Sequence, residues 1–407
     1  MRRVVVTGMS GVTAFGSDWP SVHSALQKGN NAVRYMSEWE YSDDLRTCLG
    51  APIDDYEFPK FSRKQTRSMG RVSLLSTCAT QQAIEKAGLT DSELITDGTT
   101  GIAYGSSSGS ILPINDFSRL LQTGSMKGFN SSSYIKMMGH TAPVNMGVFF
   151  GCKGRVITTS SACTSGSQGI GYAYEAIKYG QQDIMIAGGA EEISITQAAV
   201  FDTLFATSTR NQQPELTPRP FDQGRDGLVI GEGAGTLILE EYNSAKKRGA
   251  TILAEVVGFG SNSDGAHVTQ PKKDTMAVAM SLALKDAKLS PEQIGYVNAH
   301  GTATDRGDVA ETQATRSVFD RKVPISSLKS YFGHTLGACG AIEAWLAIEM
   351  MNSGWFAPTI NLENIDIDCG ELDYITELDR EMDCNYVMSN NFAFGGINTS
   401  LIFKKTN

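Results

Sequence analysis

Residues 161–166 (Ser-Ala-Cys-Thr-Ser-Gly) place one cysteine in a run of small residues. The apolar segment before them, residues 156–159, predicts a strand, and the small residues after them predict a helix. Cys163 would then stand at a helix N-terminus, where partial positive charge and free N–H groups favour a thiolate. A thiolate is a nucleophile, and a backbone N–H beside it can stabilise an oxyanion. A buried small hydrophobe without chemistry is an equally good interpretation of this hexapeptide alone.

Two of the five histidines follow strand-like segments and are flanked by glycine. His300 ends an apolar run, and α/β proteins place ligands at such strand ends. Thr302 and Thr304 follow, with hydroxyls on one side of an extended stretch. His334 lies in a turn after Lys329 and before a second small-residue helix. A structural histidine with capping threonines, and a surface lysine, are the alternatives for each segment alone.

A fourth segment combines aromatic residues with a glycine pair near the end of the chain. Phe392, Phe394 and Gly395 belong to Asn-Asn-Phe-Ala-Phe-Gly-Gly-Ile-Asn, residues 390–398. Glycine permits backbone conformations that other residues avoid, so this segment predicts a loop able to move beside a pocket. A hairpin turn between the last two strands is compatible with that interpretation.

Alternating strands and helices must position these residues. Apolar runs at residues 4–8, 101–105, 183–189, 235–239 and 294–300 predict buried strands, and residues 72–87 and 275–288 predict helices. This alternation indicates an α/β fold. The strand, serine-rich turn and small-residue helix around Cys163 recur around residues 323–341. We therefore predict a duplicated α/β unit, with an N-terminal half at residues 1–250 and a C-terminal half at residues 251–407.

Composition narrows the class of protein. The formal net charge of −9 makes nucleic acid an improbable partner. Seven cysteines without a C-x-x-C pair indicate free thiols in a reducing compartment. No apolar run approaches the ~18 residues that span a bilayer, and the N-terminus lacks the core of a signal peptide. We expect a cytoplasmic enzyme.

Four ordered motifs resemble the elongating β-ketoacyl-acyl-carrier-protein synthases, and the resemblance runs from Arg3 to Lys405. The motifs are Ala162-Cys163-Thr164-Ser165-Gly166, His300-Gly301-Thr302-x-Thr304, Lys329-Ser330-x-x-Gly333-His334 and Phe392-x-Phe394-Gly395-Gly396-x-Asn398. The resemblance implies a thiolase-like fold of two duplicated α/β halves in five layers, αβαβα. It also implies a homodimer, although a heterodimer with a related ketosynthase-like subunit stays open.

The resemblance assigns each motif a role in decarboxylative condensation. Cys163 takes an acyl group from a carrier thioester, and the neutral imidazoles of His300 and His334 stabilise the enolate formed from a malonyl-carrier thioester. Lys329 supplies a fixed positive charge. Glu343 assists Lys329 and is counted among the substrate-binding residues. Thr302 and Thr304 bind the phosphopantetheine arm. The Phe394 N–H donates to an oxyanion, and Phe392, Phe394 and Gly395 form a gating loop.

The expected substrate donor is an acyl carrier protein, which is acidic, so a local basic face is needed for docking. Arg63, Lys64, Arg67 and Arg71 supply one, and the arginines recur every four residues on one predicted helix. An ordinary solvated helix face is the alternative. We expect neither a cofactor nor a metal, because two histidines without a carboxylate or thiolate at ligand spacing do not make a metal site.

Some positions depart from the family pattern. Ser108 replaces the aliphatic residue that often lines the acyl pocket, and Leu228 stands where an aromatic residue is common. A small polar Ser108 would widen the pocket, which suggests a specialised product such as an aryl polyene or related polyketide. Three other functions stay open: a chain-length-factor-like partner subunit, a coenzyme A-dependent thiolase or initiating synthase, and a cysteine hydrolase.

Overall fold

The computed structural model describes residues 1–127 and 129–406. Within them, the main sheet has the strand order β12-β11-β10-β13-β14-β9-β1-β8-β6-β4-β5. Its strands are β1 (Val4–Val12), β4 (Thr100–Gly105), β5 (Val156–Thr159), β6 (Ile184–Glu191), β8 (Gly233–Glu241), β9 (Ala254–Ser263), β10 (Tyr296–Asn298), β11 (Pro324–Ser326), β12 (Asp373–Tyr374), β13 (Tyr386–Ala393) and β14 (Ile397–Lys404). A small second sheet contains β2 (Arg34–Tyr35), β3 (Leu49–Ala51) and β7 (Ile230–Gly231).

The main sheet repeats one pairing pattern. Going from β5 through β4, β6 and β8 to β1, the pairs are parallel, parallel, antiparallel and antiparallel. The same sequence of pairs runs from β11 through β10, β13 and β14 to β9. The two halves meet where β1 pairs with β9, over Val4–Val6 and Ala254–Val256. The strand, turn and helix repeat seen in the sequence therefore reflects a duplicated topology.

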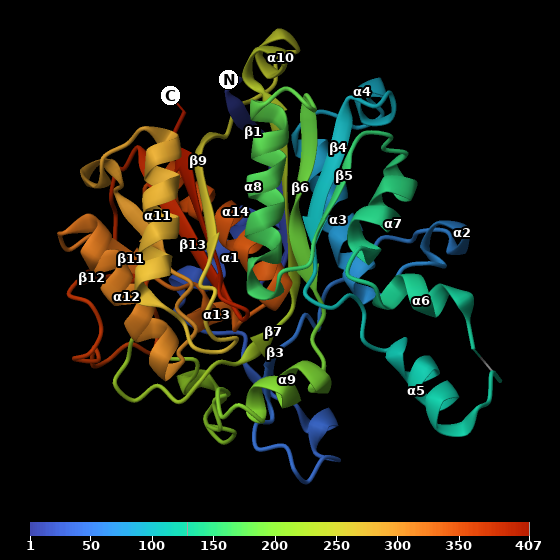
Figure 1. Cartoon of the computed structure of the whole chain (residues 1–407), viewed down its shortest axis with the longest axis horizontal. Helices are drawn as coiled ribbons and strands as arrows, with labels where there is room; N and C mark the ends of the chain where they lie inside the picture. Colours follow the sequence, from blue (N-terminus) through green and yellow to red (C-terminus); the bar gives the residue numbers. More distant parts are fainter. Residues whose placement is uncertain (128, 407) are drawn as a thin grey trace.

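Helices separate the two halves of the sheet and cover their outer faces (Figure 1). The central helices α8 (Ser165–Lys178) and α14 (Cys339–Ser353) contact strands of both halves. One outer face carries α3 (Arg71–Lys86) and α7 (Thr141–Phe150), and the other carries α11 (Lys273–Ala287) and α12 (Asp305–Phe319). The result is the five-layered αβαβα arrangement of the thiolase-like fold, as the sequence resemblance implied.

Small residues let the two central helices meet at their N-termini. A Cβ on Gly166 would lie 2.9 Å from the Ala341 nitrogen, and one on Gly340 would lie 2.8 Å from the Ser167 nitrogen. Real Cβ atoms do not pack this tightly, so glycine is required for this approach of the two backbones. The contact brings the loops of both halves to one point in the core.

The remaining helices are short. They are α1 (Trp19–Gln27), α2 (Arg63–Thr66), α4 (Glu93–Thr96), α5 (Ile114–Thr123), α6 (Ser131–Met137), α9 (Ile195–Asp202), α10 (Tyr242–Lys247) and α13 (Lys329–Phe332), with the 3-10 helices η1 (Ser37–Trp39), η2 (Ala162–Thr164), η3 (Pro214–Leu216), η4 (Pro291–Gln293) and η5 (Leu336–Ala338). No helix among the described residues is both long enough and apolar enough to cross a bilayer.

The prediction of one helix that carries Arg63, Arg67 and Arg71 is wrong. A capping box of Ser62 and Gln65 starts the short helix α2, and Gly70 is extended before α3 begins. Gly70 packs so tightly on Ser110 that a Cβ would lie 2.2 Å from its Oγ, and the Val72 N–H donates to the same oxygen at 3.2 Å. This contact breaks the helix.

Candidate active site

Cys163 lies in the tight turn that joins β5 to α8. Within this turn, Ala162 has a φ of +49°. Hydroxyl groups hold the turn: Ser165 Oγ donates to the Ala162 carbonyl at 2.7 Å, and Thr164 Oγ1 donates to the Ser161 carbonyl at 2.8 Å. Positive φ is uncommon outside glycine, and such strain concentrates at functional sites. The sulfur thus sits immediately before a helix N-terminus, where the sequence predicted it.

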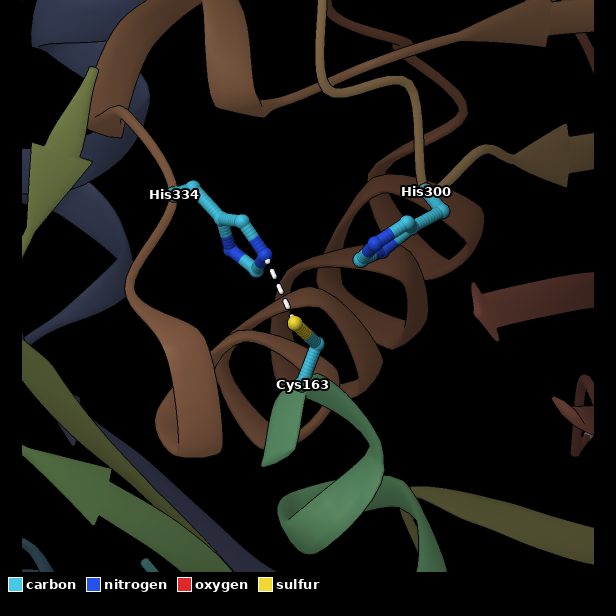
Figure 2. Close-up of side chains that lie close together, drawn as sticks. All are labelled: Cys163, His300 and His334. Carbon is cyan, nitrogen blue, oxygen red and sulfur yellow. Dashed lines mark hydrogen bonds between the residues drawn. The ribbon is translucent and has the colours of Figure 1, made fainter. Parts of the chain in front are cut away.

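The two histidines of the C-terminal half meet this sulfur. One ring nitrogen or sulfur from each of Cys163, His300 and His334 lies within 4.8 Å of the other two. His334 Nε2 is 3.0 Å from Cys163 Sγ, and the two imidazole rings meet edge to face with centroids 5.1 Å apart. Figure 2 shows both rings directed toward the sulfur from separate loops. Residues far apart in the sequence therefore share one buried pocket.

The hydrogen bonds of His334 fix its tautomer. Its Nδ1 accepts the Leu336 N–H at 3.2 Å, so the ring proton resides on Nε2, which faces Cys163 Sγ. Burial and then the positive charge of Lys329 hold the pKa of His334 well below its usual value. The imidazole is therefore neutral at pH 7 and can donate a hydrogen bond without carrying charge.

Two buried acidic side chains of α12 hold the loop that carries His300. Glu311 accepts the His300 N–H and the Gly301 N–H, each at 2.7 Å, and Asp308 accepts the Thr302 N–H at 3.0 Å. Burial raises the pKa of Glu311 to about 8 and that of Asp308 to about 6. Burial, Lys329 and His334 together hold the pKa of His300 well below its usual value. This second imidazole is also neutral at pH 7.

Lys329 forms a buried ion pair with Glu343 behind the histidines. The Lys329 Nζ donates to Glu343 Oε1, and Asn391 Nδ2 donates to Glu343 Oε2 at 2.7 Å. Burial is the largest influence on the pKa of Lys329 and would lower it, but Glu343, Cys339 and Glu311 together outweigh burial and the pKa is raised. Lys329 therefore keeps its charge, and that charge lowers the pKa of both imidazoles and of the Cys163 thiol.

Burial dominates the titration of the sulfur. It raises the pKa of Cys163 to about 11, although Lys329 and the backbone N–H groups of Phe394 and Cys163 each lower it. The expectation that the helix N-terminus yields a thiolate at rest is therefore wrong, because desolvation of the charged form outweighs it. The same two N–H groups converge beside the sulfur, as an oxyanion hole requires.

A cavity of about 440 Å³ connects the sulfur with the protein surface. Thr302 and Thr304 line it, and their hydroxyl oxygens lie 2.9 Å apart. Phe392 on β13 and Phe394 in the β13–β14 turn also line it. Gly395, in the same turn, has a φ of +86°, a conformation natural to glycine. The predicted loop is thus also the predicted hairpin turn.

The structure moves three predicted site residues away from their expected surroundings. Ser108 is half-buried outside the residues that line the cavity, so it does not widen the cavity of a single chain; its loop is fixed where Glu191 accepts the Ser107 N–H at 2.8 Å. Glu343 likewise lies behind the cavity rather than in its wall. Arg71 bonds Glu232 through Nη2 at 2.7 Å, so its charge is neutralised.

Arg63, Lys64 and Arg67 remain exposed on and beside α2. They do not line the cavity. With Arg71 removed from the set and the helix interrupted, the basic face is smaller than the sequence predicted. It is a surface feature of the chain rather than part of the catalytic pocket.

The only group of potential metal ligands that we find in the described residues is Cys163, His300 and His334. The sequence argument against a metal considered only spacing along the chain and left out the sulfur of Cys163, which the family resemblance places with the two histidines. The arrangement nevertheless fits a metal poorly. The proton on His334 Nε2 points at the sulfur, and the nearby charge of Lys329 opposes a cation. No metal is assigned.

Sequence reasoning missed Asp308, Glu311 and Asn391. Asp308 and Glu311 are three residues apart on the helix that follows His300, so they share a face. An acidic pair on one face directly after the histidine motif was a usable signal. Asn391 gave none, because its neighbour Asn390 is chemically identical and only the strand register shows which amide reaches Glu343.

Models of two protein domains match the chain and identify its family. The N-terminal domain model of the β-ketoacyl synthases matches residues 1–245, and their C-terminal domain model matches residues 253–363. The chain belongs to the β-ketoacyl synthase family. It is 38% identical to 3-oxoacyl-[acyl-carrier-protein] synthase 2 of Vibrio cholerae, over 99% of each chain.

Solved structures agree with this family assignment. A β-ketoacyl synthase from Burkholderia phymatum superimposes with a TM-score of 0.99 at 61% identity, covering 100% of both chains. A ketosynthase solved with its type II polyketide acyl-carrier protein and bound to a hexaketide has a TM-score of 0.87 at 30% identity, again over the whole of both chains.

Proposed function

We propose that this protein is an acyltransferase that condenses an acyl group held on Cys163 with a malonyl-acyl-carrier protein, giving 3-oxoacyl-acyl-carrier protein. The observation that carries the proposal is the buried contact of Cys163 Sγ with His334 Nε2 at 3.0 Å, with His300 beside it. Family membership and the name of the Vibrio cholerae relative support the same reaction.

In the first step, Cys163 attacks the acyl thioester of a carrier. The new bond joins Sγ to the acyl carbon, the bond to the carrier sulfur breaks, and the sulfhydryl proton passes to the departing carrier thiolate. The N–H groups of Cys163 and Phe394 bind the transient oxyanion. Because the thiol pKa is near 11, the proton leaves only as attack proceeds, with Lys329 and the His334 Nε2–H stabilising the negative sulfur.

In the second step, a malonyl thioester enters the same cavity with its arm along Thr302 and Thr304. The bond between C2 and the carboxylate breaks and releases CO₂, and its electron pair forms an enolate. Two neutral imidazoles, His300 and His334, can hold the enolate oxygen by hydrogen bonds without protonating it irreversibly. The enolate carbon then attacks the acyl carbonyl, the bond to Sγ breaks, and the departing Cys163 thiolate takes up one proton from solvent to return to the thiol.

Purified protein should convert acyl-carrier and malonyl-carrier proteins to 3-oxoacyl-carrier and CO₂. Mass spectrometry should detect an acyl adduct on Cys163 in the absence of malonyl donor. Cys163→Ala should lose the adduct and reduce condensation by about 10³-fold or more. An adduct that forms on another cysteine, or condensation that survives in Cys163→Ala, would overturn the assignment of the nucleophile.

Two alternative functions would give different results in the adduct and condensation experiments. A chain-length-factor-like subunit would form no adduct and would act only beside a second ketosynthase. A thiolase or initiating synthase would accept acyl-coenzyme A as readily as acyl-carrier protein. We favour the elongating enzyme because Cys163, His300 and His334 share one pocket and the charged Lys329 lies behind them.

Carrier docking and assembly form part of the proposal. We infer that Arg63, Lys64 and Arg67, which are exposed, attract an acidic carrier. We also infer a homodimer. Strand β5 pairs only with β4 at the edge of the sheet, and its Val156 is 48% exposed. An exposed edge of this kind readily pairs with a second copy. Helix α5, which has no buried residue, gives further exposed surface on the same chain.

The proposal also covers the biosynthetic pathway and the location of the enzyme. We infer chain elongation in fatty-acid or polyketide-type synthesis, with aryl polyenes among the candidate products. We also infer a cytoplasmic location, supported by seven cysteines that form no disulfide in the structure. A profile of acyl donors in the condensation assay separates the pathways, because a preference for plain saturated chains would reject the specialised product.

A further inference from the structure

Phe205 has an unusual backbone at the mouth of the catalytic cavity. It lines the cavity, its φ is +55°, and it is 78% exposed. A bulky residue rarely adopts positive φ, because its Cβ then crowds the backbone. Exposure means that burial of the ring does not repay this cost within the chain.

The local fold explains the backbone but not the side chain. Helix α9 ends when the Ala206 N–H donates to the Phe201 carbonyl and the Phe205 N–H donates to the Asp202 carbonyl, each at 3.0 Å. This pair of bonds is a Schellman motif, whose left-handed position normally holds glycine. Glycine would therefore terminate α9 better than Phe205. Strain without a folding benefit points to a function of the ring.

The surroundings of the ring form a rim. Leu204 and Val268 also line the cavity and are 45% and 67% exposed. We call Leu204, Phe205 and Val268 the apolar rim. The Arg46 guanidinium stacks over the Phe205 ring at 4.2 Å, while its backbone N–H donates to Asp202 at 3.1 Å. The ring is thus supported from one side and open to solvent on another.

We propose that the apolar rim binds the apolar surface of the acyl carrier protein next to the serine that bears its phosphopantetheine arm, with Phe205 as the main contact. This inference rests on the proposed function. Once the thioester reaches the buried sulfur, the part of a carrier-linked substrate that stays at the mouth is the carrier itself. The exposed rim surrounds that mouth, whereas the acyl group must lie deeper.

Charged side chains at the cavity mouth can attract an acidic carrier, but they do not account for its binding alone. The Arg46 guanidinium stacks on Phe205 but is paired with Asp202 at 3.2 Å, so the exposed Arg306 in the cavity wall is the cation that can face an acidic carrier. Asp305 lies beside Arg306 in the same wall, so the mouth is mixed in sign. The apolar rim is then the feature that fixes the carrier in place, as buried aromatic anchors do at other interfaces.

The test replaces the ring without changing the preferred backbone. Phe205→Asn and Phe205→Gly both suit a left-handed position. Each should raise KM for acyl-carrier and malonyl-carrier proteins by about tenfold, the loss typical of one aromatic anchor, with kcat nearly unchanged. Turnover of acyl and malonyl pantetheine thioesters, which lack the carrier, should stay at the wild-type rate. Thermal stability should stay equal or rise, because the strain is relieved.

Matched variants separate the explanations. Val200→Asn removes an apolar side chain that is 55% exposed on α9 but outside the cavity, and it should leave KM unchanged. Arg67→Glu should raise carrier KM through charge and respond strongly to salt, whereas Phe205→Asn should respond weakly. The inference is overturned if carrier KM is unaffected in Phe205→Asn, or if pantetheine thioesters lose as much as carriers. Wild-type protein that condenses no donor would instead refute the proposed function.

Discussion

The turn at Cys163 and the turn at Gly337 occupy equivalent places in the two halves. Each is a 3-10 helix that leads directly into a central helix, η2 into α8 and η5 into α14. Each contains one residue with positive φ, +49° at Ala162 and +46° at Leu336. The backbone solution is therefore the same in both halves.

The surroundings of the two turns differ completely. A Cβ on Gly337 would lie 2.6 Å from the Ser107 nitrogen, and its N–H donates to Glu191 at 3.0 Å. Beside Gly337, the backbone of Ser107 fills the space that corresponds to the cavity beside Cys163. The C-terminal half instead sends His300 and His334 across to the sulfur. The duplicated fold therefore contains two equivalent turns before its central helices. The side chains around them make the turn at Cys163 reactive and the turn at Gly337 a packing contact.

Removing the charge of Lys329 behind the Cys163 turn should have the largest effect of the substitutions that test this contrast. Lys329→Met leaves Glu343 buried without its cation, so unfolding free energy should fall by about 3–5 kcal/mol. Condensation should fall as well, because Lys329 stabilises the negative sulfur. Urea denaturation and the condensation assay measure the two losses.

The double variant Lys329→Met with Glu343→Gln separates stability from chemistry. It removes both charges, so it should recover most of the lost stability while condensation stays low. Full activity in the double variant would show that the charge is only structural.

Filling the packed turn should have an intermediate effect. Gly337→Ala forces a Cβ against Ser107 and Glu191, and overpacking of this kind costs about 1–3 kcal/mol. Gly147→Ala on α7 is the control, because its Cβ would meet Ile102 at an ordinary 3.7 Å. Denaturation midpoints compare the two variants. Equal midpoints would contradict the contrast between a packed turn and an open one.

The smallest expected effect is a shift in the pH dependence of alkylation. With a pKa near 11, Cys163 is mostly thiol at pH 7, so its rate with iodoacetamide should rise about tenfold per pH unit toward pH 11. Lys329→Met removes a charge that lowers this pKa, so the profile should move to higher pH. Cys78, whose pKa burial also raises to about 11, lacks that cation and should not move. A plateau below pH 8 would show a resting thiolate.

Much of the fold and the centre of the site could be predicted from the sequence. Apolar runs identified the main strands, and the echo around residues 156–166 and 323–341 identified the duplication, because both are local patterns. The convergence of Cys163, His300 and His334 followed from the ordered motifs of the family resemblance.

Features set by distant contacts could not be predicted. The break at Gly70 depends on Ser110, and the pairing of Arg71 with Glu232 depends on the fold. The pKa of Cys163 depends on burial, which spacing does not reveal. Phe205 gave no sequence signal, because its importance lies in a backbone angle and an exposed position at the cavity mouth.

The seam between β1 and β9 has a consequence for synthesis of the chain. Strand β1 lies between β8 and β9 in the finished sheet, and these neighbours begin only at Gly233 and Ala254. The backbone of β1 therefore stays unpaired, and its apolar side chains stay unpacked, until translation has passed Gly233 and Ala254. Nascent chains of this enzyme should therefore be clients of chaperones that shield early apolar segments, and completion of the N-terminal half should come late in translation.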